Sequence, residues 1–191
     1  MKKMLVFLLV AFSFKATSQC ERRDTLTKIF QGVLSDYPEI KKNSVRLVFT
    51  EKKRHMMWAR PTIKSFFKKE MDYIVFVSKD MIYQKFMDTL SQDAFVGWYA
   101  HELGHVVDYN MRGKLGVLWM GVEYMLFSKG RARMENRADK IAIEHGYGCQ
   151  LLASVNTSKA HLPNWKKKQV ERFYLKRSQL EKLIKECQQR E

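Results

Sequence analysis

Two histidines near the middle of the chain have the spacing of a metal-binding pair. They belong to the stretch His101-Glu102-Leu103-Gly104-His105. On a helix, residues four apart lie on one face, so both imidazoles can bind a single ion. Glu102 lies one step round the helix, where its carboxylate can accept a proton from water near that ion. The pattern therefore predicts a catalytic metal site with His101 and His105 as ligands and Glu102 as the base.

A catalytic zinc site needs one more protein ligand than two histidines. A third histidine six residues after His105 is excluded, because that position holds Met111. Asp108 continues the same helix, and we expect it to support the site rather than bind the ion. Glu135 and Asp139 lie on the alanine-lined inner face of a predicted helix over 131–145, where an unpaired charge is costly. Glu135 is therefore the expected third ligand, the alternative being a buried salt bridge to an arginine.

The two motifs together resemble the gluzincin group of zinc metallopeptidases, in particular its small single-domain members. The resemblance depends on the histidine motif and on the later Glu135-Asn136-Arg137-Ala138-Asp139, and it covers about residues 70–145. It implies one catalytic Zn²⁺ held by His101, His105 and Glu135. It also implies that Asp139 orients His101, and that Glu102 acts as general base and then general acid while a metal-activated water hydrolyses a peptide bond.

The resemblance further implies that an extended peptide substrate binds along an edge strand. The run Tyr73–Ser78 is the expected strand, with Tyr73, Val75 and Val77 as substrate-binding residues. The alternative is a central strand whose apolar run belongs to the core. The family also uses a side chain that stabilises the transition state. The candidates for this role are His145, Tyr147 and Tyr124. The alternative for each of them is a purely structural role.

Hydrophobic periodicity predicts an α+β fold, with a small N-terminal β-sheet packed on a mostly helical, zincin-like remainder. Strands are expected at 45–50 and 73–78, and the basic connection 52–70 has room for another short strand. Helices are expected at 25–34, 80–89, 92–111, 115–128, 131–145 and 163–188.

The helix at 92–111 has two different faces. Its apolar arc, expected to face the core, consists of Phe95, Val96, Tyr99, Ala100, Leu103, Val106 and Val107. The two histidines lie on the opposite arc among small residues such as Gly97 and Gly104. We expect those small residues to let a ligand or another helix approach.

The N-terminus has the pattern of a secretory signal. Lys2 and Lys3 precede an apolar run from Met4 to Phe12, and small residues follow up to Ser18. We therefore expect a signal peptide at 1–18, one domain at 19–191, and a periplasmic or secreted protein. Lipid anchoring through Cys20 is the alternative. The pairing of Cys20, Cys149 and Cys187 stays open.

The 191-residue chain carries a formal net charge of +15. Part of it lies on the basic helix at 163–188, whose charged face is either solvated or binds anions. The alternative function is therefore a basic, non-catalytic protein that binds anionic cell-surface polymers, with any metal structural; nucleic acid is not expected as a partner. The apolar segment Leu115–Phe127 is too short to cross a bilayer, and no span is expected after signal removal. This segment is either a buried core helix or a helix that touches membrane or substrate.

Overall fold

The computed structural model describes residues 21–51, 56–79, 90–161 and 175–188. Within them the chain is α+β, as expected. Residues 21–35 form a helix, and the elements that follow are η1 (Pro38–Ile40), β1 (Val45–Thr50), β2 (Met57–Pro61), η2 (Ile63–Phe67), β3 (Tyr73–Ser78), α3 (Gln92–Leu126), α4 (Ser128–Glu144), α5 (Gly148–His161) and α7 (Arg177–Gln188). The predicted signal peptide, the helix at 80–89, residues 163–174 of the basic helix, Cys20 and the side chain of Cys187 lie outside the described residues. Cys149 is an exposed free thiol.

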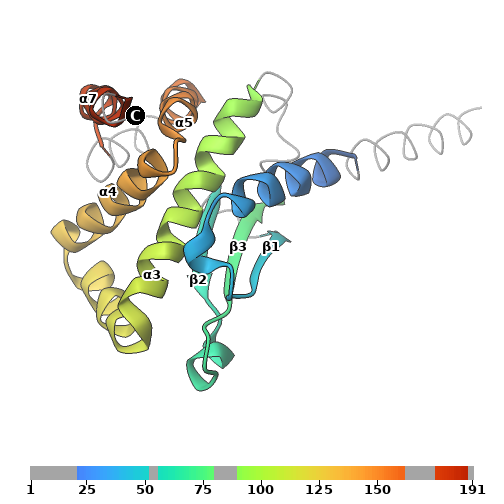
Figure 1. Cartoon of the computed structure of the whole chain (residues 1–191), viewed down its shortest axis with the longest axis vertical. Helices are drawn as coiled ribbons and strands as arrows, with labels where there is room; N and C mark the ends of the chain where they lie inside the picture. The colour runs from blue at the N-terminus through green and yellow to red at the C-terminus, as the bar shows by residue number, and fades with distance from the viewer. Residues whose placement is uncertain (1–20, 52–55, 80–89, 162–174, 189–191) are drawn as a thin grey trace, which may run out of the picture.

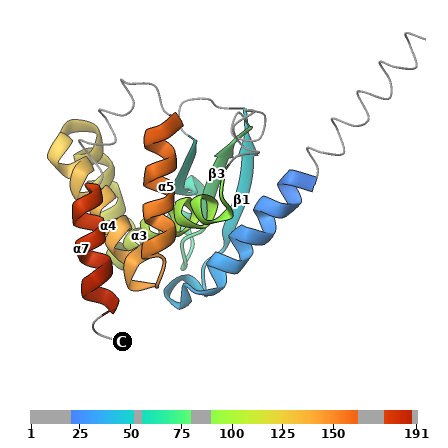
Figure 2. The same cartoon turned by 90° about the horizontal axis from the view of Figure 1, so that it is seen from above.

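Helix α3 runs through the middle of the molecule. The sheet and the helix at 21–35 lie on one side of it, and α4, α5 and α7 lie on the other (Figures 1 and 2). The core lies on both sides of α3. On the side of the sheet, Phe30 of the first helix packs edge-on against Tyr99 with ring centroids 5.4 Å apart. On the other side, buried residues of α4, α5 and α7 such as Leu151 and Leu180 belong to the same cluster. Tyr37 donates a hydrogen bond of 2.9 Å to the carbonyl of Ala100, which joins the N-terminal segment to α3.

The sheet places β3 in the centre, so the prediction of β3 as an edge strand is wrong. The strand order is β1-β3-β2, with β1 parallel and β2 antiparallel to β3. Tyr73, Val75 and Val77 are 0% exposed and belong to the core. With both edges of β3 hydrogen-bonded and these side chains buried, they are not available to bind a substrate. The edge strand nearest α3 in the described part of the chain is β2, the short strand for which the basic connection had room.

The helices follow the predicted pattern with one omission. The expected helices at 92–111 and 115–128 form α3, which kinks between them at Gly113 (φ 64°, ψ −177°), a left-handed conformation that favours glycine. The helix expected at 131–145 is α4, and the C-terminal part of the expected basic helix is α7. Helix α5 was not predicted, because its hydrophobic periodicity is weak.

The histidine face of α3 is buried because two helices cover it. A Cβ atom at Gly97 would lie 2.1 Å from the carbonyl oxygen of Gln150 in α5, and one at Gly104 would lie 2.5 Å from the carbonyl oxygen of Ala138 in α4. The small residues on this face therefore allow other helices to pack closely, which is one of the two possibilities expected from the sequence. The opposite, apolar arc faces the core as predicted.

The part of α3 after Gly113 is less buried than a core helix. Only Val117 and Met120 are buried there, while Leu115 is 83% exposed and Met125 is 75% exposed. The core-helix interpretation of Leu115–Phe127 is therefore wrong for most of its side chains. None of the helices in the described ranges combines the length and the apolar character needed to cross a bilayer.

Candidate metal site

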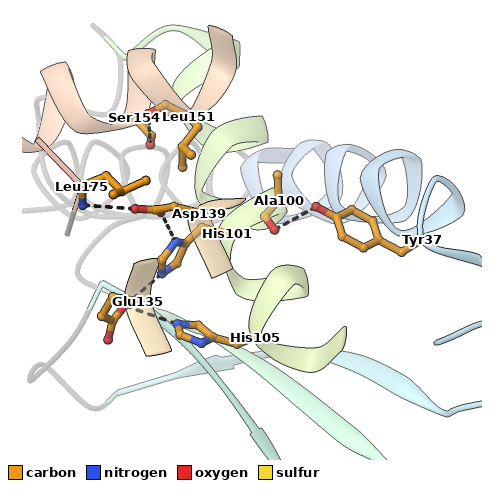
Figure 3. Close-up of polar contacts among 9 residues, drawn as sticks. All are labelled: Tyr37, Ala100, His101, His105, Glu135, Asp139, Leu151, Ser154 and Leu175. Carbon is orange, nitrogen blue, oxygen red and sulfur yellow. Dashed lines mark hydrogen bonds and ion pairs between the residues drawn. The ribbon is translucent and has the colours of Figure 1, made fainter. Parts of the chain in front are cut away.

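Three side chains from α3 and α4 point their donor atoms at one another (Figure 3). The Nε2 atoms of His101 and His105 lie 3.2 Å and 3.3 Å from the same oxygen, Oε2 of Glu135. The two histidines follow each other by one turn of α3, and Glu135 comes from the facing turn of α4. The structure thus brings together the three residues predicted as ligands.

The donor set fits a divalent metal ion. The three ligand atoms lie within 4.8 Å of one another, and all three residues are buried. In a tetrahedral zinc site with bonds of about 2.0–2.1 Å, neighbouring donor atoms are about 3.3 Å apart. The separations between each histidine nitrogen and Glu135 already have this value. Buried His101, His105 and Glu135 could therefore hold a metal ion.

Asp139 lies one turn after Glu135 on α4 and holds His101 from behind. Nδ1 of His101 donates a hydrogen bond of 2.7 Å to Oδ1 of Asp139, which leaves Nε2 to face Glu135. The second oxygen of Asp139 accepts a bond of 3.3 Å from the backbone N–H of Leu175, just before α7. This places Asp139 where it was predicted. The contribution of Leu175 was missed, and no sequence signal marks it, because a backbone N–H is common to nearly all residues.

The electrostatics of the cluster show that it is a tightly coupled group. Burial acts to lower the pKa of His101, but hydrogen bonds to Asp139 and Glu135 raise that pKa well above the usual 6.5. Burial acts to raise the pKa of Glu135, yet hydrogen bonds from His101 and His105 lower it far below 4.5. Without a metal, the cluster therefore keeps a carboxylate beside a protonated imidazole.

Glu102 lies beside this cluster without joining it. One oxygen accepts a hydrogen bond from the backbone N–H of Ala59 on β2, and Oε2 is buried with no hydrogen-bond partner among the described residues. Burial is the largest cause of a raised pKa for this carboxyl. A buried carboxylate with one unused oxygen needs a partner that the described residues do not supply, as expected for a group that exchanges a proton with water or substrate.

Asp108 is engaged elsewhere. Its Oδ1 accepts a bond of 2.9 Å from Arg112, and its Oδ2 accepts one of 3.1 Å from Arg137 on α4. Two guanidinium groups thus use both oxygens of the carboxylate. Asp108 joins α3 to α4 beside the site, which agrees with the supporting role expected for it.

Two of the residues considered for transition-state stabilisation have structural contacts instead. The His145 ring stacks on Tyr37 with centroids 4.2 Å apart and lies within 3.1 Å of Glu39, and the Tyr147 hydroxyl donates to Asp36. Tyr124 lies under the guanidinium of Arg131.

Tyr109, which was not among the predicted site residues, stacks on His105 with centroids 6.0 Å apart. Burial raises the pKa of its phenol, and the negative charges of Glu102 and Glu135 raise it further. The phenol therefore keeps its proton near the site. Its place four residues after His105, on the same face of α3, was the available signal.

Comparison with known proteins found no matching family model, no similar curated protein and no similar solved structure. The assignment of this site therefore depends on its own geometry.

Proposed function

We propose that this protein is an exported, zinc-dependent metallopeptidase of the gluzincin type with a zincin-like fold. The observation that carries the proposal is the convergence of both Nε2 atoms on one oxygen of Glu135, at distances of 3.2 Å and 3.3 Å, with Asp139 behind His101. Structural zinc sites are closed by four protein ligands, whereas the described part of the chain offers three at this cluster. The predicted signal peptide supports export to the periplasm or the medium.

The chain's own residues divide the chemistry between them. His101, His105 and Glu135 would hold the ion, and zinc in such a site supplies a Lewis acid that polarises a carbonyl and lowers the pKa of bound water to about 7. Glu102 takes the proton from the attacking water at its unpaired oxygen and gives it to the leaving amine. Its raised pKa suits both transfers, because a group must accept and release the proton in one cycle. Asp139 keeps the His101 proton on Nδ1.

The substrate peptide is expected along β2. This strand lies at an edge of the described sheet, and its Ala59 N–H contacts Glu102. A peptide paired with this edge would place its carbonyls next to the base. This replaces the earlier assignment to β3, whose side chains are in the core.

The decisive experiment combines metal analysis with hydrolysis of casein. The wild-type protein is expected to bind one zinc ion and to cleave casein, with loss of cleavage in a chelator and its return on adding zinc. Glu102→Gln keeps the shape of the side chain but removes the base, so it should keep zinc and lose cleavage by a factor of at least about 100. Glu144→Gln, an exposed carboxylate on α4, is the matched control and should leave both unchanged.

Other results would contradict the proposal in identifiable ways. Hydrolysis retained by Glu102→Gln would exclude Glu102 as the base. Iron in place of zinc would indicate the chemistry of two-histidine, one-carboxylate iron proteins. Zinc binding without hydrolysis in either form would favour the alternative, a basic binding protein with a structural metal.

A further inference from the structure

The second half of α3 carries an apolar arc that faces away from the protein. Six side chains form it, each at least 37% exposed: Leu115, Leu118, Trp119, Val122, Met125 and Leu126. At 3.6 residues per turn they fall within about 120° of the helix circumference. The arc is thus one continuous stripe, and no charged residue interrupts it.

The opposite side of the same helix is anchored in the protein. Val117 is 8% exposed and Met120 is 1% exposed, so they hold the helix in place by its inner face. Glu123 lies at the border of the arc and pairs with Arg133 at 3.2 Å. The inner face of this part of α3 therefore packs against the rest of the protein, while the stripe on its outer face stays exposed.

A second apolar group lies at the same end of the molecule. Phe67 is 91% exposed and Ile63 is 75% exposed, both in η2. Lys114, at the start of the stripe, donates a hydrogen bond to the carbonyl of Lys68, which joins η2 to α3. In Figure 1 the two segments lie together at the lower end of the molecule. We call this surface, formed by residues 63–69 and 114–127, the apolar end.

Basic side chains surround the apolar end. Lys64, Lys69 and Lys129 are exposed there, and Lys114 adds a fourth cation. Of the nearby acids, Asp72 pairs with Lys68 and Glu123 pairs with Arg133, which leaves Glu70 as the exposed carboxylate of this part of the described chain. Cations that border an apolar stripe complement a negatively charged surface that also accepts apolar groups.

We propose that the apolar end docks on the surface of an anionic lipid bilayer. The stripe enters the boundary between headgroups and acyl chains, and the lysines contact the headgroup phosphates. A second copy of this chain fits less well, because two basic surfaces would repel each other across the interface. The inference is independent of the metal site and of the proposed hydrolysis.

The test is co-sedimentation with vesicles at low and high salt. The wild-type protein should bind vesicles made of equal parts phosphatidylcholine and phosphatidylglycerol, and should bind pure phosphatidylcholine at least about tenfold less. High salt should weaken the binding. Adding the mixed vesicles should also shift Trp119 emission to the blue, and Trp119→Phe should remove most of that shift while keeping the binding.

Variants distinguish binding by the apolar end from binding by the overall net charge. All of them keep the apolar N-terminal run, so a difference between variants does not come from that run. Leu118→Gln combined with Trp119→Gln should lower binding at least about tenfold without changing the melting temperature, because both side chains are already exposed. Lys64→Gln combined with Lys69→Gln should also weaken binding. The matched pair Lys140→Gln with Lys176→Gln removes the same charge from exposed positions elsewhere and should change it less.

Three outcomes would overturn the proposal. One is equal binding to neutral and anionic vesicles. Another is equal loss in the two lysine pairs, which would indicate a general charge effect. The last is the absence of vesicle binding together with a dimer that Trp119→Gln abolishes, which would identify the apolar end as a contact between copies.

Discussion

The close approach of α3 and α4 at Gly104 should control the metal site. A Cβ atom at this position would lie 2.5 Å from the carbonyl oxygen of Ala138, whereas ordinary contact begins at 3.4 Å. Gly104→Ala must therefore move the helices apart by about 0.9 Å, because the clash is with backbone rather than with a flexible side chain. Ala138 lies on the same helix as Glu135 and Asp139, so the site moves with it.

The consequence for the ligands follows from the distances. If α4 moves directly away by about 0.9 Å, the His101–Asp139 bond lengthens from 2.7 Å to about 3.6 Å, beyond hydrogen-bond range. Loss of a bond that orients a histidine ligand lowers metal affinity by about 10–100-fold. The clash itself should cost about 1–3 kcal/mol of stability.

Isothermal titration calorimetry with Zn²⁺ and thermal melts of the chelated protein measure the two effects separately. The matched control is Gly121→Ala, on the same helix with nothing within 4 Å of its added Cβ. It should keep zinc affinity and gain up to about 1 kcal/mol, since alanine favours the helix. Zinc affinity in Gly104→Ala within twofold of wild type would refute the argument that close helix packing aligns the ligands.

Three further predictions concern the same cluster. Asp139→Asn should bind zinc about 10–100-fold more weakly, because its amide no longer accepts a charge-assisted bond from His101 in the required tautomer; calorimetry beside Asp36→Asn, an exposed carboxylate, checks this. In a chelator, stability should be greatest between about pH 4.5 and 6.5. The pKa of His101 is raised in the folded protein, so its ion pairs stabilise the fold fully below pH 6.5, and this contribution is lost as the pH rises through the folded-state pKa. The pKa of Glu135 is lowered, so its contribution is present above pH 4.5 and is lost as the pH falls through the folded-state pKa. Melting curves from pH 4 to 9 should show the maximum in wild type and a flatter profile in Glu135→Gln; a wild-type profile that rises steadily to pH 9 would contradict the pairing. Finally, zinc at about 100 times its dissociation constant should stabilise the protein by about 2.7 kcal/mol, an increment that His105→Ala should abolish.

Much of the candidate site could be predicted because it depends on spacing within helices. His101 and His105 share a face of any helix that contains them, and the same is true of Glu135 and Asp139. The alanine and glycine residues around them also indicated that another helix approaches. The break between two helical segments at Gly113 and the core arc of α3 were predictable for the same reason.

The strand order could not be obtained in this way. The run Tyr73–Ser78 is apolar on both faces, which is compatible with an edge or a central position. Only the pairing with β1 and β2, which join it from different parts of the chain, decides that Tyr73, Val75 and Val77 are core residues. The exposure of the apolar stripe on α3 could not be predicted either. The apolar composition of a helix face does not show which neighbouring element, if any, covers it.

The amino-acid sequence by itself determined which donor atoms share a helix face, since that follows from the fixed rise and turn of an α-helix. The tertiary structure decided which faces meet: α4 against the histidines, Leu175 against Asp139, β2 rather than β3 beside Glu102, and no described element over the outer stripe of α3. These contacts join residues far apart in the chain, and their free energy depends on how whole surfaces fit together rather than on local periodicity.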